Sequence, residues 1–252
     1  MKIQQIRNAT LKITYMGSTF LVDPWLQDKG TGFSAPTRKK EMSGIKNPMN
    51  NLPFSAEQIL SDVEFCLITH THPDHFTADY LPKDMKMFVQ NKEDVKTVKS
   101  MGFLNVYEIS DNGLIINDIH IDKTPCVHGS NIIVAKMMKE VHGFYISGEE
   151  KSVYIVGDTV LTKDISDILK SRKPDAVVLN CCEATLPLGR LIMNLTDIDS
   201  VCRLVPDSVI IASHLNSVNH SYLMRTDVQS YVQKKGLKQV TVPEDGEIIN
   251  IP

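Results

Sequence analysis

Short apolar stretches, some alternating with polar residues and some continuous, dominate the hydrophobic pattern of this chain. Segments 2–6, 10–15 and 19–22 alternate as half-buried strands do, which predicts three strands near the start. Continuous runs rich in Val and Ile predict buried strands at 63–69, 153–157, 176–179 and 208–213.

A polar residue follows the 19–22 strand and each of the continuous runs: Asp23, His70, Asp158, Asn180 and His214. In α/β proteins, ligands bind outside the carboxyl ends of the strands, at a shared edge of the sheet. These side chains are therefore predicted to lie at one common site.

Helical spacing of apolar residues appears between the strands. It predicts helices over 56–60, 94–101, 164–171, 197–204 and 222–235, with Thr196 as the N-cap of the fourth. Since strands come in runs as well as in alternation with helices, we expect a layered α/β fold with mixed sheets. No shift of composition marks a domain boundary, which favours a single domain over residues 1–252.

A long polar stretch, about residues 27–52, has few periodic apolar positions and is rich in Gly and Pro. Loops of this length inside a compact domain are usually functional lids or disordered segments. Because predicted structure resumes on both sides, we interpret this stretch as a lid over the active site.

The strongest candidate for chemistry is segment 70–75, which reads His-Thr-His-Pro-Asp-His. Alternation on a strand places His70 and His72 on one face, and Pro73 favours a helix that begins just after it. Imidazoles and carboxylates suit Zn²⁺, Mn²⁺ or Fe²⁺, so the segment predicts a site for one or two metal ions. A solvated surface cluster is the alternative, which the buried-looking strand before the segment disfavours.

The segment resembles the His-x-His-x-Asp-His signature of the metallo-β-lactamase fold superfamily, and the resemblance extends over essentially the whole chain. Asp23, His128 in Pro-Cys-Val-His-Gly, Asp158 in Gly-Asp-Thr and His214 match the other motifs of that family. The resemblance implies an αββα sandwich, in which two mixed β-sheets pack face to face and helices cover the outer faces.

The resemblance also implies two divalent metal ions, with Zn or Mn favoured over Fe. One metal would take His70, His72 and His128, the other Asp74, His75 and His214, with Asp158 shared between them. Asp23 would support the metal-binding loop from behind. The implied reaction is hydrolysis of an ester, lactone or phosphoester bond by a hydroxide that the two metals activate, with Asp74 orienting the water.

His220 and Asn219, which follow His214 in the chain, are further candidates for roles in catalysis or substrate binding. His220 would donate a proton to the leaving group or bind substrate, and a packing role is equally open. Asn219 is a candidate for substrate binding with the same alternative. Arg38 and Lys39, in the most basic part of the 27–52 loop, are candidates to attract a small anionic substrate, although a solvated charge run is the commoner explanation of such a pattern.

Residues 211–225 are similar to the branch of the superfamily related to the ascorbate-6-phosphate lactonase, which consists largely of metal-dependent hydrolases of unknown substrate. Cys181 and Cys182 depart from the small residues expected in that region. A thiol near metals can bind or tune them, whereas a free Cys is usually a small buried apolar group. We favour the second interpretation.

Composition narrows the class of protein. The 252 residues include 27 Lys and Arg against 30 Asp and Glu, a net charge of −3, and are 42% hydrophobic, which is ordinary for a globular domain. A nucleic-acid binder needs a basic footprint, so a small-molecule substrate is expected and a nucleic-acid phosphodiesterase is a weaker alternative. A di-iron redox protein on the same ligands stays open, and a non-catalytic scaffold is disfavoured because every ligand position is filled.

The five Cys are odd in number and lack CxxC spacing, which indicates a reduced chain. The first residues show no apolar core of signal-peptide length, and no apolar run reaches the roughly 18 residues of a membrane span. We expect a cytoplasmic protein without a membrane partner. Homo-oligomerisation is left open as the commonest state of such proteins.

Overall fold

Two seven-stranded sheets form the centre of the computed structural model, which describes residues 1–149 and 151–252. The first has the order β16-β1-β2-β3-β4-β5-β6 and the second the order β15-β14-β11-β10-β9-β8-β7. The strands of the first sheet are β1 (Lys2–Arg7), β2 (Thr10–Tyr15), β3 (Ser18–Val22), β4 (Phe65–Leu67), β5 (Lys86–Val89), β6 (Val106–Glu108) and β16 (Ile248–Asn250). Those of the second are β7 (Leu114–Ile116), β8 (Ile119–Pro125), β9 (His142–Ser147), β10 (Ser152–Ile155), β11 (Ala176–Asn180), β14 (Val209–Ser213) and β15 (Val240–Thr241).

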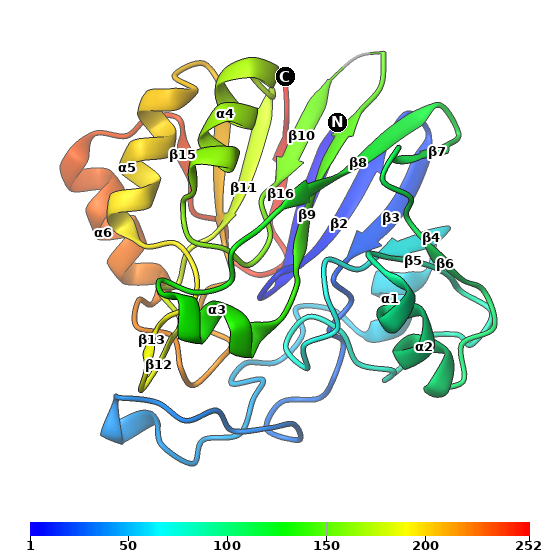
Figure 1. The fold of residues 1–252 in the computed structure, drawn as a ribbon, viewed down its shortest axis with the longest axis horizontal. Helices are drawn as coiled ribbons and strands as arrows, with labels where there is room; N and C mark the ends of the chain where they lie inside the picture. Colours follow the sequence, from blue (N-terminus) through cyan, green and yellow to red (C-terminus); the bar gives the residue numbers. More distant parts are fainter. Residues whose placement is uncertain (150) are drawn as a thin grey trace.

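Helices cover the outer faces of both sheets, as Figure 1 shows. Alternation along the strands explains the layers, because successive side chains point to opposite faces. In β3, Phe20 and Val22 belong to the core between the sheets, whereas Leu21 belongs to the outer core of the first sheet. The outer helices are α1 (Ala56–Leu60) and α2 (Lys92–Ser100) on the first sheet, and α4 (Lys163–Arg172), α5 (Leu195–Leu204) and α6 (Arg225–Lys235) on the second. This αββα sandwich confirms the predicted fold class.

Both sheets are mixed, as expected. β3 to β6 are parallel while β1 to β3 are antiparallel, and β10, β11, β14 and β15 are parallel while β7 to β10 are antiparallel. The central parallel strands β3, β4, β11 and β14 are buried on both sides, which is why they read as continuous apolar runs. Their carboxyl ends lie at one edge of the sandwich, and this edge carries the site described below.

Three predictions of local structure were wrong. No helix follows Pro73; instead, the backbone N–H groups of His75 and Phe76 both donate to the His72 carbonyl and close a turn. The fourth predicted helix begins at Leu195, two residues before the predicted start. Its N-cap is Asn194 and not Thr196, since the Asn194 side chain accepts from Thr196 N and Asp197 N. The last helix begins at Arg225, after an irregular segment that carries His220.

The end of the sandwich opposite the two chain termini carries irregular segments (Figure 1). Here lie α3 (Ile132–Met138), the hairpin of β12 (Thr185–Leu186) and β13 (Gly189–Arg190), and loop 27–52, which holds only a short 3₁₀ turn at Lys40–Met42. The sequence pattern predicted neither α3 nor the hairpin. Among the described residues, no helix is long and apolar enough to cross a membrane.

Candidate metal centre

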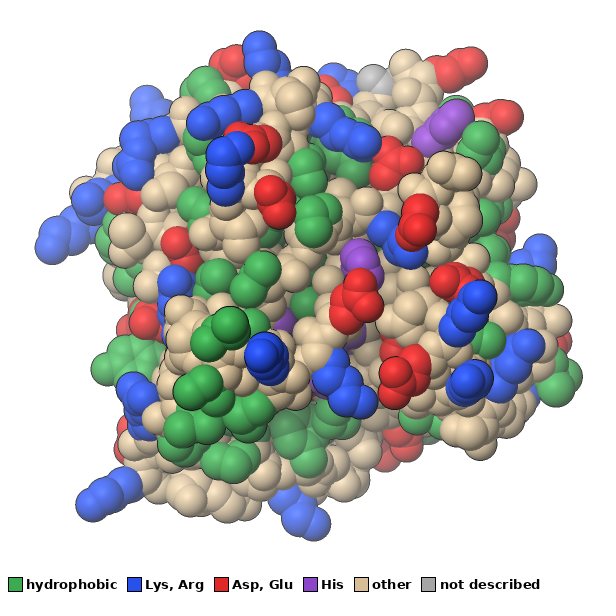
Figure 2. Space-filling model, in the orientation of Figure 1, with side chains coloured by type: hydrophobic (Ala, Val, Ile, Leu, Met, Phe, Trp, Pro, Cys, Tyr) green, Lys and Arg blue, Asp and Glu red, His purple; other side chains and the backbone are tan. Residues whose placement is uncertain are grey.

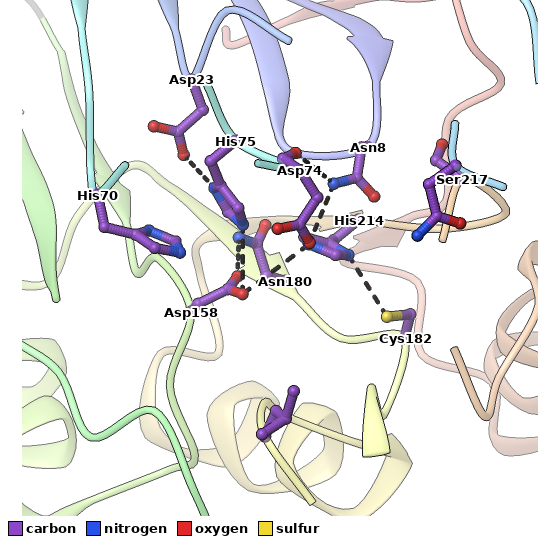
Figure 3. Close-up of polar contacts among 12 residues, drawn as sticks. Asn8, Asp23, His70, Asp74, His75, Asp158, Asn180, Cys182, His214 and Ser217 are labelled. Carbon is purple, nitrogen blue, oxygen red and sulfur yellow. Dashed lines mark hydrogen bonds and ion pairs between the residues drawn. The ribbon is translucent and has the colours of Figure 1, made fainter. Parts of the chain in front are cut away.

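The predicted metal-ligand residues meet beyond the carboxyl ends of the central strands, and Figure 3 shows most of them. Asp23 follows β3, segment 70–75 follows β4, Asp158 comes soon after β10 and His214 follows β14. Asp23 and His214 have φ values of 48° and 64°, in the left-handed region that costs a non-glycine residue on the order of 1 kcal/mol or more. Tertiary hydrogen bonds hold both, from Asp23 N to Leu67 O (2.9 Å) and from His214 N to Asn8 O (3.0 Å).

Imidazoles and carboxylates from four separate segments form three overlapping groups. In each group, one potential ligand atom per residue lies within 4.8 Å of the others. The groups are His70, His72 and His128; His70, His75 and Asp158; and Asp74, His75 and His214. The structure thus brings together all seven residues that the resemblance assigned to metal ligation, in the two predicted triads and with Asp158 between them.

Asp23 orients two of these imidazoles from behind. Its carboxylate accepts from Thr69 N and from Thr69 Oγ1, each at 2.7 Å, and lies 2.7 Å from His75 Nδ1. Because the Thr69 hydroxyl donates to Asp23, it accepts from His70 Nδ1 at 2.9 Å. In the neutral form of both rings Nδ1 therefore carries the proton, and Nε2 keeps its lone pair for a ligand bond in the cluster.

Asp158 occupies the middle of the cluster and is 3% exposed. Its Oδ2 lies 3.2 Å from His75 Nε2, 3.5 Å from His128 Nε2 and 3.9 Å from His214 Nε2. Its Oδ1 accepts from the Asn180 amide at 2.7 Å, which fixes the carboxylate plane. One oxygen that faces three imidazoles is the arrangement that a bridging ligand requires.

The donor set fits a metal pair. The Nε2 atom of His70 is buried without a hydrogen-bond partner, a costly state for a polar atom unless it binds an ion. Burial lowers the pKa of His70, and burial together with His128 lowers that of His72 to about 4, so both rings are neutral, the form that binds metals.

The other triad lies in a more negative environment. Burial lowers the pKa of His75, but Asp158 and Asp23 outweigh this effect and raise it to about 10. For His214 the same opposition, with Asp158 as the main charge, raises the pKa. The buried carboxylates of Asp74 and Asp158 thus require compensating positive charge, which divalent cations supply as readily as protons do.

A cavity of about 270 Å³ opens onto this cluster. His72, Asp74, His128 and Asp158 form its floor, which we call the cavity floor, and His220 stands at its side. The other lining residues are Phe33, Ser34, Ala35, Pro36, Pro73, Met138, Leu186 and Leu191. The lining described here is therefore mostly apolar and includes no Lys or Arg.

Loop 27–52, which we call the cavity roof, contributes Phe33 to Pro36 to this lining. The buried Arg7 guanidinium donates to Gln27 O at 2.8 Å and to Asn50 O at 3.2 Å, and so ties the two ends of the loop together. Whether the roof opens and closes as the predicted lid stays a prediction.

The candidate substrate-binding residues lie elsewhere. The Asn219 side chain is fully buried and holds the roof: its Oδ1 accepts from Ala35 N (3.0 Å), and its Nδ2 donates to Ala35 O (2.8 Å). The exposed Arg38 donates to the Pro187 carbonyl, and the half-buried Lys39 donates to the Tyr222 carbonyl. None of the three lines the cavity, so direct contact with substrate stays a prediction for them.

Two residues at the cluster escaped the sequence interpretation. The Asn8 amide donates to Asp74 O at 2.9 Å and lies 3.1 Å from His214 Nε2. The Cys182 thiol, predicted to be a plain buried apolar group, lies 3.4 Å from His214 Nδ1. Asn8 follows the end of β1 directly, so the strand-end argument applied to Asp23 and His214 would also have found it.

Comparison with known proteins agrees with the fold and the site. The chain matches the family model of the beta-lactamase superfamily domain over residues 2–214, and it belongs to the metallo-β-lactamase superfamily. Within it, the chain is a member of the UPF0173 family of metal-dependent hydrolases: it is 38% identical to the UPF0173 protein YddR of Bacillus subtilis (strain 168) over 253 residues, 98% of each chain.

Two solved structures are similar over nearly the full length. A possible metal-dependent hydrolase from Veillonella parvula DSM 2008 has a TM-score of 0.92 at 34% identity, covering 99% of this chain and 98% of that one. An isothiocyanate hydrolase from Delia radicum gut bacteria has a TM-score of 0.91 at 34% identity, covering 99% of both chains. These likenesses agree with the assignment as a metal-dependent hydrolase.

Proposed function

We propose that this protein hydrolyses a small, uncharged substrate with an apolar body, at a two-metal centre. The observation that carries the proposal is the cavity: its floor consists of imidazoles and carboxylates, whereas its walls and roof are mostly apolar. Figure 2 shows apolar side chains gathered over α3, beside the cavity, where Ile132, Ile133 and Met137 are exposed. An apolar approach to a polar floor suits a neutral ligand that places one reactive group on the floor.

The metal centre is proposed on the ligand set given above, with His70, His72 and His128 on one side, Asp74, His75 and His214 on the other and Asp158 shared. A pair of divalent ions supplies a water of lowered pKa and a Lewis acid for the developing negative charge. Zn or Mn is favoured because the donors are nitrogen and oxygen atoms, and iron would accept the same donors.

Asp74 and His220 are the proposed proton-transfer residues. Asp74 lines the cavity, and its Oδ2 lies 3.5 Å from His214 Nε2, so its carboxylate can orient the attacking water and accept a proton. His220 also lines the cavity, is 7% exposed, and its Nδ1 has no hydrogen-bond partner. An imidazole that lines the substrate space is suited to pass a proton to the leaving group.

Isothiocyanates are the first class to test, because they are neutral, carry an apolar group and have an electrophilic carbon. The isothiocyanate hydrolase to which this chain is 34% identical supports the choice. Addition of water across the C=N bond of R–N=C=S gives a thiocarbamate, which releases R–NH₂ and COS once the nitrogen is protonated. His220 is placed to deliver that proton.

A neutral ester or lactone is the second candidate, since the same floor would polarise its carbonyl. A phosphoester would have to place its charged phosphate on the floor itself, and a phosphorylated lactone such as ascorbate-6-phosphate lactone needs a cationic partner for a phosphate that lies away from the floor. The lining described above offers it none. Arg38 and Lys39 would have to leave their carbonyl partners to provide one.

The test is a panel of an aryl isothiocyanate, a neutral lactone, bis-p-nitrophenyl phosphate and a phosphorylated sugar lactone, assayed with metal-loaded protein. We expect amine release from the isothiocyanate to be fastest and the phosphates to be slowest. In His72→Ala turnover should fall by on the order of 10³-fold, whereas His120→Ala, a change of an exposed His on β8, should leave it unaltered. Faster hydrolysis of either phosphate would overturn the proposal of a neutral substrate.

A further inference from the structure

Cys182 contacts an imidazole of the metal cluster, which a role as a buried apolar residue does not explain. Cys182 is fully buried, and its Sγ lies 3.4 Å from Nδ1 of His214, the nitrogen that points away from the cluster (Figure 3). Its backbone is held too, because Tyr222 N and Leu223 N both donate to Cys182 O, at 3.0 and 2.9 Å. The thiol is therefore fixed against the imidazole.

The hydrogen bonds around His214 show which ring nitrogen carries the proton. The Asn8 Nδ2 group donates to the Asp74 carbonyl oxygen, which accepts only, so the amide nitrogen and not its oxygen faces His214 Nε2 at 3.1 Å. In a neutral ring Nε2 is then the acceptor and Nδ1–H the donor. Nδ1–H points at Cys182, whose sulfur is the acceptor.

Three other candidate imidazole ligands follow the same rule with different acceptors. His75 Nδ1 faces the Asp23 carboxylate, His70 Nδ1 faces the Thr69 hydroxyl, and His128 Nδ1 lies 3.2 Å from the Leu191 carbonyl oxygen. Each partner keeps the proton on Nδ1 and leaves Nε2 free for an ion. His214 alone among these four has sulfur in that place.

We propose that Cys182 is a positioning residue of the metal centre: its thiol accepts the Nδ1–H of His214, fixes the tautomer and orientation of that ring, and so strengthens ion binding at the Asp74, His75 and His214 position. The inference rests on the proposed role of His214 as a ligand. Loss of such an outer partner typically costs 10- to 100-fold in metal affinity.

The neighbouring cysteine provides a matched control. Cys181 is equally buried, but its Sγ contacts the Ser213 carbonyl oxygen, at 3.8 Å, and not an imidazole nitrogen. Replacement of either Cys by Ala removes one buried sulfur from the same strand end. Only the change at position 182 removes an acceptor from the imidazole.

The experiment compares Zn²⁺ and Co²⁺ binding, by competition with a chromophoric chelator, in the wild type, Cys182→Ala, Cys182→Ser, Cys181→Ala and His214→Ala. We expect Cys182→Ala to weaken one of two binding events by about 10-fold or more, Cys182→Ser to restore most of it because a hydroxyl also accepts, and Cys181→Ala to match the wild type. The Co²⁺ absorption bands should change in Cys182→Ala and not in Cys181→Ala.

Each failure has its own signature. If His214→Ala weakens binding while Cys182→Ala does not, the role of Cys182 is overturned and the proposed ligand set survives. If neither change weakens binding, both fall. Nitrogen NMR of the wild-type metal-loaded protein needs no variant: it should show His214 protonated at Nδ1, and a proton at Nε2 would overturn the inference.

Discussion

The floor and the roof of the cavity are built in opposite ways. The floor residues lie a few residues beyond strand ends and belong to a largely buried cluster that Asp23, Asp158 and Asn180 hold together. The roof is a loop with a single 3₁₀ turn, and a few side chains such as Arg7 and Asn219 tie it to the sandwich. A sheet edge fixes a ligand geometry precisely, whereas a tethered loop can change its lining without disturbing the sheets. The floor therefore sets the chemistry and the roof sets which substrate reaches it.

The largest effect should come from removal of the metal ions from the cluster. Dialysis against a chelator should abolish hydrolysis and lower Tm, because ions held by the folded state alone contribute about 4 kcal/mol of stability at a thousandfold excess over Kd. Addition of Zn²⁺ or Mn²⁺ should restore both turnover and Tm, measured by the amine-release assay and by calorimetry. Full activity in metal-free protein would refute the assignment of the floor.

Asp23→Asn should have the next largest effect, since it weakens the support of two cluster imidazoles, His70 and His75, while leaving the ligands in place. Metal affinity should fall by about 10- to 100-fold in a chelator competition assay. Asp111→Asn is the control: that carboxylate is exposed and pairs with Lys123 at 2.9 Å, so affinity should not change. Equal affinities in both variants would show that Asp23 does not orient the ligands.

Asn219→Ala should disturb the roof and leave the metal-binding floor unchanged. It removes the bonds to Ala35 and Asn47, which should lower the free energy of unfolding by about 1–3 kcal/mol because buried partners are left unpaired. We expect kcat/KM to fall by about 10-fold, mainly through KM, with metal content unchanged. Loss of bound metal, measured by elemental analysis, would show that the two regions are not independent.

Arg38→Ala and Lys39→Ala should have the smallest effect. Arg38 is exposed and Lys39 is half-buried, and each donates to a backbone carbonyl outside the cavity, where substitutions usually change stability by less than about 0.5 kcal/mol. Turnover of a neutral substrate should change by less than about 3-fold. A larger loss confined to anionic substrates would instead support the predicted role of these residues in substrate binding.

The sequence predicted the residues after the strands better than it predicted the irregular segments around the cavity. The strand-end residues were predicted correctly as neighbours because a buried apolar run and the polar residue after it are adjacent in the chain. The prediction of a helix after Pro73 was wrong. The His72 carbonyl accepts hydrogen bonds that close a turn, and this turn directs His75 toward Asp23. α3 was not predicted because its exposed Ile132, Ile133 and Met137 hide the helical alternation of polar and apolar residues.

The sequence by itself determined the layered fold, the chemical type of the ligands and their place after strands, because periodicity and side-chain chemistry are local properties. Only the tertiary structure decided that Asn219 fastens the roof, that Cys182 faces His214 and that the cavity walls are apolar. These facts depend on contacts between residues as distant as Ala35 and Asn219, and no local pattern in the chain encodes which surfaces meet when the two sheets pack.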